Sequence, residues 1–158
     1  MKVKNRIRIS YVLWALLPLA VGGLSALLSM KGMQENAFLT QPALQPPPWV
    51  FMAAWTVLYL LMGIGAALVW NAAPRGWKDA LIPFIGQLFL NFLWSPLYFA
   101  WKLRLAAFIV LLGMLGLAVW MTAAFRRVRK AAGNLQIPYL LWLCFAAYLN
   151  LASYILNG

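Results

Sequence analysis

Residues 46–59 read Pro46-Pro47-Pro48-Trp49-Val50-Phe51-Met52-Ala53-Ala54-Trp55-Thr56-Val57-Leu58-Tyr59 and join a proline run to an apolar segment. Proline fixes φ and has no N–H to donate, so a triple proline is excluded from a helix interior but suits its first turn. The run therefore predicts the end of a loop and the start of a helix. Within that helix, Trp55 and Tyr59 lie one turn apart on the same face. Two aromatic side chains on an inward face form a surface on which a flat apolar ligand can stack.

The composition requires a lipid bilayer around this chain. Its 158 residues are 65% hydrophobic and 9% charged, whereas a soluble domain of this size buries only about two-thirds of the surface that its unfolded chain exposes. A membrane-spanning helix needs roughly 20 apolar residues. The apolar runs predict an all-α membrane protein, a bundle of five transmembrane helices in one domain over residues 1–158. The spans lie near 9–30, 47–71, 79–101, 105–125 and 135–156.

Residues 31–46 form the one long connection between these spans. The other connections are short, so successive helices are expected to be antiparallel neighbours. Long connections in compact domains are usually functional, and this one carries Glu35, Asn36, Pro42 and Gln45. We expect it to act as a lid over the bundle.

The basic residues lie between the apolar runs and predict the orientation in the membrane. Thirteen Lys and Arg against two acidic residues give a net charge of +11, and grouping at span ends is typical of membrane topology rather than of nucleic-acid binding. One side carries ten of them: Lys2, Lys4, Arg6, Arg8, Arg75, Lys78, Arg126, Arg127, Arg129 and Lys130. The other side carries Lys31, Lys102 and Arg104. Because basic residues stay inside, the N-terminus is predicted to be cytoplasmic and the first loop and the C-terminus to lie outside.

Polar and aromatic side chains form a stripe on each of three spans. The stripes are Met52, Trp55, Tyr59 and Met62; Gln87, Asn91, Trp94 and Tyr98; and Tyr139, Trp142, Ala146, Asn150 and Ser153. Uncharged polar side chains in a membrane turn away from lipid. With a rise of about 1.5 Å per residue, the predicted topology brings the upper members of all three stripes to one depth below the first loop. The stripes therefore predict a shared interior pocket.

Two groups of these residues have a second interpretation. Gln87, Asn91 and Asn150 can also be hydrogen-bond contacts between helices that bind no ligand. The small-residue pairs Gly22–Ala26 and Gly63–Ala67 favour close helix packing, either within one chain or across a homodimer.

The residues needed for common catalytic chemistry are missing. The chain has no histidine, and its only carboxylates, Glu35 and Asp79, are predicted at opposite membrane faces. Neither a catalytic triad nor a metal-ligand cluster can be assembled from these residue types. Asp79 is best explained as a carboxylate in the first turn of a helix. We therefore expect no metal, no cofactor and no conventional acid–base catalysis.

Three ordered segments resemble the motifs of one membrane-protein family. They are residues 46–59, residues 86–99 (GQLFLNFLWSPLYF) and residues 138–150 (PYLLWLCFAAYLN). They are similar to the second-, third- and fifth-helix motifs of the translocator proteins, also called tryptophan-rich sensory proteins or peripheral benzodiazepine receptors. With the five-span plan, the resemblance covers nearly the whole chain and indicates a bacterial member of the family.

The resemblance implies a five-helix bundle, often a homodimer, that binds porphyrins, sterols and benzodiazepine-type drugs beneath its first loop. Carried over position by position, it implies a pocket of Trp55, Asn91, Trp94, Trp142, Ala146 and Asn150. The stripes add Tyr59 and Gln87 as ligand-binding residues. The implied ligand is protoporphyrin IX or a haem-like tetrapyrrole, and the implied location is the bacterial cytoplasmic membrane.

The chain departs from the family pattern in the first loop and at its end. The loop of the family carries Trp-Tyr followed by Lys-Pro, where this chain has Glu35, Asn36, Gln41 and Pro42, and a further tryptophan is replaced by Leu44. No basic residue follows Tyr154, so the sterol consensus is incomplete and a sterol partner is not expected.

Three functions remain open from the sequence. The first is a membrane receptor or translocator for porphyrin-type tetrapyrroles, linked to their transport or to stress sensing. The second is an enzyme that degrades porphyrin with light or oxygen, for which Trp55 and Trp142 would be the reactive residues. The third is an accessory membrane protein whose pocket only senses a metabolite.

Overall fold

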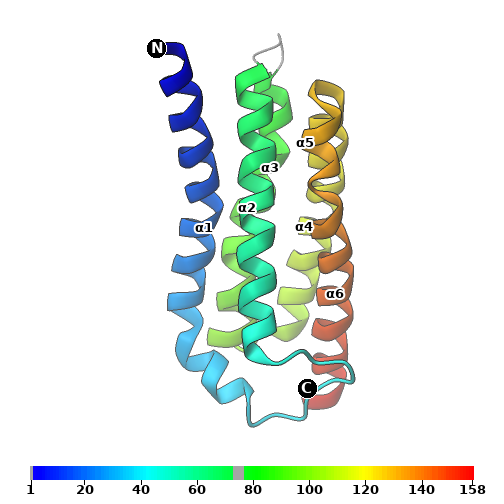
Figure 1. Cartoon of the computed structure of the whole chain (residues 1–158). Coiled ribbons are helices and arrows are strands. Elements are labelled where there is room, and N and C mark those ends of the chain that lie inside the picture. Colours follow the sequence, from blue (N-terminus) through cyan, green and yellow to red (C-terminus); the bar gives the residue numbers. More distant parts are fainter. Residues whose placement is uncertain (1, 73–76) are drawn as a thin grey trace.

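The computed structural model describes residues 2–72 and 77–158, which form helices and short connections without a strand (Figure 1). The helices are α1 (Lys2–Asn36), α2 (Pro48–Ala72), α3 (Trp77–Ser95), the π-helical η1 (Pro96–Ala100), α4 (Arg104–Val128), α5 (Lys130–Asn134) and α6 (Ile137–Asn157). Because α3 continues into η1 and α5 precedes α6 directly, they form five segments long and apolar enough to cross a membrane. The predicted five-helix membrane bundle is confirmed.

Proline and aspartate mark the helix starts that the sequence predicts. Pro48 is the first residue of α2, and Val50 N–H donates 3.0 Å to the carbonyl of Pro47. Asp79 lies in the first turn of α3, where a carboxylate stabilises the helix dipole. Pro96 lies where α3 gives way to η1, because a residue without an N–H interrupts the regular α-helical hydrogen bonds.

The first helix is longer than predicted, and the first loop is shorter. The sequence predicts a span over 9–30 and a loop over 31–46, but α1 continues to Asn36, so the loop covers residues 37–47. Lys, Met, Gln and Glu in residues 31–36 are good helix formers although they are not all apolar. Gly32 also lets this last part of α1 lie directly against η1, since a Cβ at Gly32 would collide with the carbonyl of Phe99.

Two glycines allow α1 and α2 to pack closely. A Cβ on Gly63 (α2) would collide with the backbone of Trp14 and Ala15 (α1), and a Cβ on Gly22 (α1) would collide with the Tyr59 ring (α2). The close packing predicted from the small-residue pairs therefore occurs within one chain. By contrast, a Cβ on the neighbouring Gly23 would meet nothing.

The two ends of the bundle differ in their connections. The N-terminus and the α4–α5 connection lie at one end, and the loop of residues 37–47 and the C-terminus lie at the other (Figure 1). Asn157 of α6 fastens this loop, because it accepts from the Thr40 N–H at 3.1 Å and donates to the Thr40 carbonyl at 3.0 Å. Tyr148 donates to the Ala43 carbonyl at 3.0 Å. Arg75, one of the ten basic residues counted for the opposite end, lies outside the described residues.

Candidate ligand-binding site

Trp55 lies at the centre of an aromatic cluster contributed by α2, α3 and α6. Its ring centroid lies 5.4 Å from Tyr59, 6.3 Å from Trp94, 6.3 Å from Tyr139 and 6.4 Å from Trp142. These distances fall in the range of roughly 4.5–7 Å at which aromatic rings attract one another. The stripes of three helices thus converge, as the sequence predicts.

A chain of hydrogen bonds runs beneath Trp55. The Tyr59 hydroxyl donates to Asn91 Oδ1 at 2.6 Å, and Asn91 Nδ2 donates to the Tyr139 hydroxyl at 3.3 Å. The Tyr139 hydroxyl in turn donates to Gln87 Oε1 at 2.7 Å. Gln87 Nε2 reaches Met62 Sδ at 2.8 Å. All five side chains are buried, so this chain joins α2, α3 and α6 in the bundle interior.

A second polar pair lies nearer the loop end. Trp94 Nε1 donates to Asn150 Oδ1 at 3.1 Å, and Asn150 Nδ2 donates to the carbonyl of Arg104 at 2.8 Å. Trp94, Ala146 and Asn150 line a cavity of about 30 Å³ that also touches Phe51. This pair therefore connects the aromatic cluster to the start of α4.

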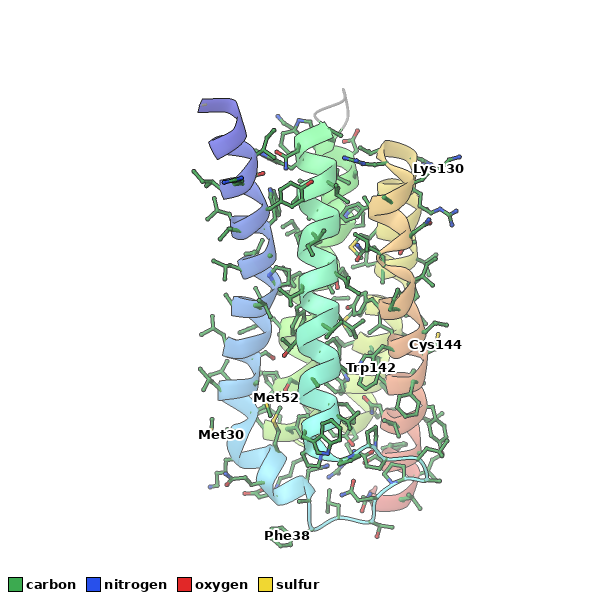
Figure 2. All side chains as sticks on the ribbon, viewed as in Figure 1. Met30, Phe38, Met52, Lys130, Trp142 and Cys144 are labelled. Atoms are coloured by element: carbon green, nitrogen blue, oxygen red, sulfur yellow. The ribbon has the colours of Figure 1, made fainter. Side chains whose placement is uncertain are left out.

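The structure brings the eight predicted site residues into one region of the bundle. Trp55, Tyr59, Trp94 and Trp142 form the aromatic cluster with Tyr139. Asn91 and Asn150 bond to members of this cluster, and Ala146 lines the adjoining cavity. Gln87 lies deeper and reaches the cluster through Tyr139. Figure 2 places Trp142 between α2 and α6. Its indole N–H is buried and has no hydrogen-bond partner among the described residues. A free donor at the cluster is available to a polar group of a ligand.

Sequence reasoning placed Tyr139 on an inward stripe but not among the ligand-binding residues, missed Phe51 and misplaced Met52. Tyr139 contacts Trp55, Asn91 and Gln87, and it shares its helical face with Trp142, which was the signal for it. Phe51 lies 5.4 Å from Trp142. Met52, which the spacing groups with Trp55, is 69% exposed. The stripe on α2 therefore begins with Phe51 rather than with Met52.

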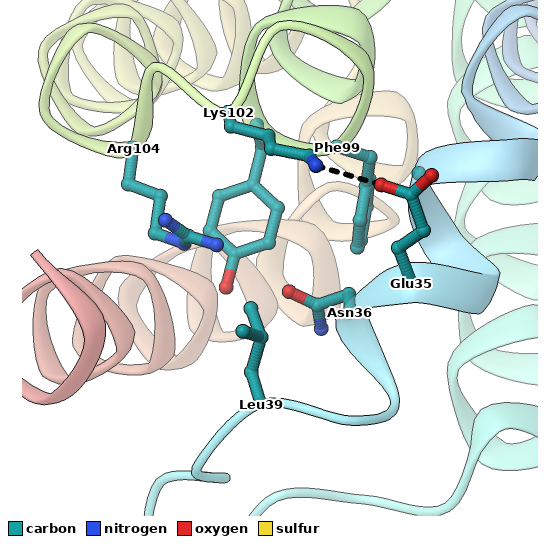
Figure 3. Close-up of a pocket in the computed structure, with 8 residues that line it drawn as sticks. Glu35, Asn36, Leu39, Phe99, Lys102 and Arg104 are labelled. Carbon is teal, nitrogen blue, oxygen red and sulfur yellow. Dashed lines mark ion pairs between the residues drawn. The ribbon is translucent and has the colours of Figure 1, made fainter.

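A larger cavity of about 60 Å³ lies next to the first one, at the loop end (Figure 3). Its charged members are Glu35, Lys102 and Arg104, and Lys102 Nζ lies 2.7 Å from Glu35 Oε2. Asn36, Tyr98 and Phe99 line both cavities. The apolar aromatic site thus continues into a charged site.

Comparison with known proteins gives the same result as the motifs. A model described as the TspO/MBR family matches residues 14–155. The chain belongs to the TspO/MBR family. Five apolar spans and this membership identify it as an integral membrane protein.

Relatives of the family from distant organisms resemble the chain over most of its length. The Translocator protein of Ovis aries is 39% identical over 123 residues, which cover 76% of this chain and 73% of the relative. Tryptophan-rich protein TspO of Archaeoglobus fulgidus is 37% identical over 143 residues, covering 89% and 92%. The Tryptophan-rich sensory protein of Cereibacter sphaeroides is 38% identical over 133 residues, covering 84% and 81%. The names of these family members are those of translocator and sensory membrane proteins.

Proposed function

We propose that the protein is a membrane receptor or translocator that binds porphyrin-type tetrapyrroles, and benzodiazepine-like drugs, in the pocket around Trp55. The observation that carries the proposal is that two indoles and two phenols, from three helices, contact the Trp55 ring. Flat, apolar macrocycles bind by stacking on such faces, and a few polar groups fix their orientation. Asn150 and the free N–H of Trp142 would supply those polar groups.

Binding of a macrocycle requires the site to open. Pockets for small molecules are about 300–1,000 Å³ in volume, whereas the two cavities here measure about 60 and 30 Å³. The aromatic side chains themselves fill the remaining space. We infer that the Trp55 and Trp142 rings move apart and that the loop of residues 37–47 lifts when a ligand enters. Only a few hydrogen bonds hold this loop to α6, so lifting the loop requires little free energy.

The test is quenching of tryptophan fluorescence by protoporphyrin IX in the purified protein. Replacing Trp55 or Trp142 with alanine should weaken binding by about tenfold or more, since stacking of an aromatic ring contributes about 1–3 kcal/mol. Trp120→Ala is the matched control, because Trp120 is 52% exposed on the outer side of α4. Unchanged affinity in both pocket variants would contradict the assignment of the binding site to the pocket around Trp55.

Porphyrin degradation is the second candidate function, and the continuous series of indole and phenol rings favours it. Indoles and phenols can be oxidised, and the rings around Trp55 lie close enough to exchange electrons with a stacked porphyrin. The co-reactant would be dioxygen, with or without light. Loss of porphyrin absorbance should be measured under dioxygen and under argon, in the dark and under illumination. Turnover lost in Trp55→Phe while binding persists would support an enzyme, and binding without turnover would exclude it.

We also propose that the protein lies in a bacterial cytoplasmic membrane with its N-terminus inside. The support for this orientation is the charge distribution between the two ends of the bundle. Lys31, Lys102 and Arg104 belong to the loop end, and the other described basic residues belong to the N-terminal end. The pocket would then face the outer half of the bilayer.

A further inference from the structure

Arg104 is the cation of this cavity that no carboxylate side chain pairs with among the described residues, and the Tyr98 hydroxyl lies beside its guanidinium. Its Nη1 donates to the Gly158 carbonyl at 3.3 Å, and its buried Nε has no hydrogen-bond partner among the described residues. A buried donor of a charged group without a partner is costly. The neighbouring Lys102, by contrast, is paired with Glu35 at 2.7 Å.

The cavity beside Arg104 carries a net positive charge. Of its lining residues, Lys102 and Arg104 are cations and Glu35 is the single carboxylate, which leaves +1. Since Glu35 is engaged by Lys102, the guanidinium is the group left to attract an anion (Figure 3). Its planar fork of N–H groups matches the two oxygens of a carboxylate. The cavity volume of about 60 Å³ is sufficient for a carboxylate group but not for a larger ligand.

This cavity is joined directly to the aromatic site. Tyr98 and Phe99 form the wall that the two cavities share, and Asn150 Nδ2 donates to the Arg104 carbonyl at 2.8 Å. An apolar body that lies against Trp94 therefore borders the cavity that Arg104 lines.

We propose that Arg104 binds the carboxylate of an amphipathic acid whose apolar body occupies the aromatic site around Trp55. A tetrapyrrole with propionate side chains and a long-chain fatty acid from the bilayer both present this chemistry. For the tetrapyrrole, this inference rests on the function proposed above, whereas for the fatty acid it does not. Arg104 would give up its contact with the Gly158 carbonyl and pair with the carboxylate through two N–H groups.

Acid and ester forms of one ligand separate the carboxylate contact from stacking. The wild-type protein and Arg104→Gln should be titrated with protoporphyrin IX and with its neutral dimethyl ester. The variant should weaken binding of the diacid by about tenfold, because a hydrogen bond to a charged group contributes about 1.5–3 kcal/mol, and leave binding of the ester unchanged. The ester also serves as the folding control, and the Asn150 contact survives because it is to the backbone of Arg104. Lys31→Gln, at the same end but outside both cavities, should change neither affinity.

A second pair of probes identifies the source of the carboxylate. Bromostearic acid and its methyl ester quench nearby tryptophans, and the same two proteins should be titrated with both. Arg104-dependent binding of the fatty acid, without binding of any porphyrin by the wild type, would support the carboxylate site and reject the tetrapyrrole function. Equal effects of Arg104→Gln on acids and esters, or no effect on any of the four probes, would overturn the role of Arg104. If both porphyrins still bound, and bound through Trp55, the proposed tetrapyrrole function would nevertheless stand.

Discussion

The Tyr139 hydroxyl shows how the amides in this bundle are used. It accepts from Asn91 and donates to Gln87, while Tyr59 donates to Asn91. Gln87 therefore has protein partners for both ends of its amide, and so has Asn91. Both residues act first as contacts between helices, which is one of the two interpretations that the sequence leaves open. A ligand that bonds to Asn91 must displace a tyrosine.

Removal of the Tyr139 hydroxyl should destabilise the bundle more than removal of the Tyr59 hydroxyl. Tyr139→Phe leaves Asn91 Nδ2 and Gln87 Oε1 unpaired, whereas Tyr59→Phe leaves only Asn91 Oδ1 unpaired. An average hydrogen bond in a membrane interior contributes about 0.6 kcal/mol, and a buried polar group left without a partner costs more. We therefore expect Tyr139→Phe to lower the free energy of unfolding by about 1–2 kcal/mol. Thermal unfolding in detergent measures the difference in Tm. Equal Tm values for the two variants would contradict the series of hydrogen bonds through Tyr139.

Residue spacing predicts which faces converge, but it does not resolve single side chains at the edge of a face. Trp55, Trp94 and Trp142 meet as expected because spacings of three and four keep residues on one face. The prediction that Met52 faces the pocket is wrong, because Met52 lies at the edge of that face and Phe51 contacts Trp142 instead. The sequence places Arg104 only on the side of the membrane that carries the first loop. Its buried Nε and its link to Asn150 depend on how α4 and α6 pack, which no local pattern contains.

At the scale of elements, helix bounds were predictable where lipid or proline determines them. Pro48 marks the start of α2, and the apolar run marks the core of each span. The end of α1 was not predictable from hydropathy, because residues 31–36 are stabilised as helix by propensity and by contact with η1 rather than by lipid. The same extension brings Glu35 of α1 to Lys102.

The packing of α1 on α2 should depend on Gly63 and not on Gly23. In Gly63→Ala the added methyl group meets the backbone of Trp14 and Ala15, which cannot yield without separating the helices. Such overpacking costs about 1–3 kcal/mol. Gly23→Ala is the matched control, because its methyl group meets nothing and alanine is the better helix former by about 1 kcal/mol. We expect the Tm in detergent to fall for the first variant and to be unchanged or raised for the second.

The loop of residues 37–47 should loosen when Asn157 is replaced. Asn157→Leu removes the donor and the acceptor that hold Thr40, and two exposed bonds of about 0.5–1.5 kcal/mol each correspond to roughly a fivefold or greater increase in opening. Hydrogen exchange followed by mass spectrometry should show faster exchange in this loop and unchanged exchange in α3. Asn134→Leu, on the exposed side of α5 at the opposite end, is the control. Unchanged loop exchange would show that other contacts hold the loop.

At the scale of the whole molecule, the bundle is polarised along its long axis. The two cavities, the fastened loop and Arg104 share the end that has few basic residues. The other end carries most of the basic residues. An amphipathic acid would therefore meet the site from the side of the membrane that faces the loop, where Arg104 and Lys102 attract its carboxylate.

The proposed orientation of the bundle rests on this polarity and can be measured with single cysteines. The natural Cys144 is first replaced in Cys144→Ser, since it is exposed. Phe38→Cys then places a thiol on the loop, where Phe38 is 90% exposed. Asn134→Cys places a thiol at the opposite end of the bundle, the end at which Lys130 lies (Figure 2). Because basic residues are retained on the cytoplasmic side, a membrane-impermeant maleimide added to intact spheroplasts should label the first thiol and should label the second only after lysis. The opposite pattern would place the pocket in the inner half of the bilayer, and Arg104 would then meet acids from the cytoplasm.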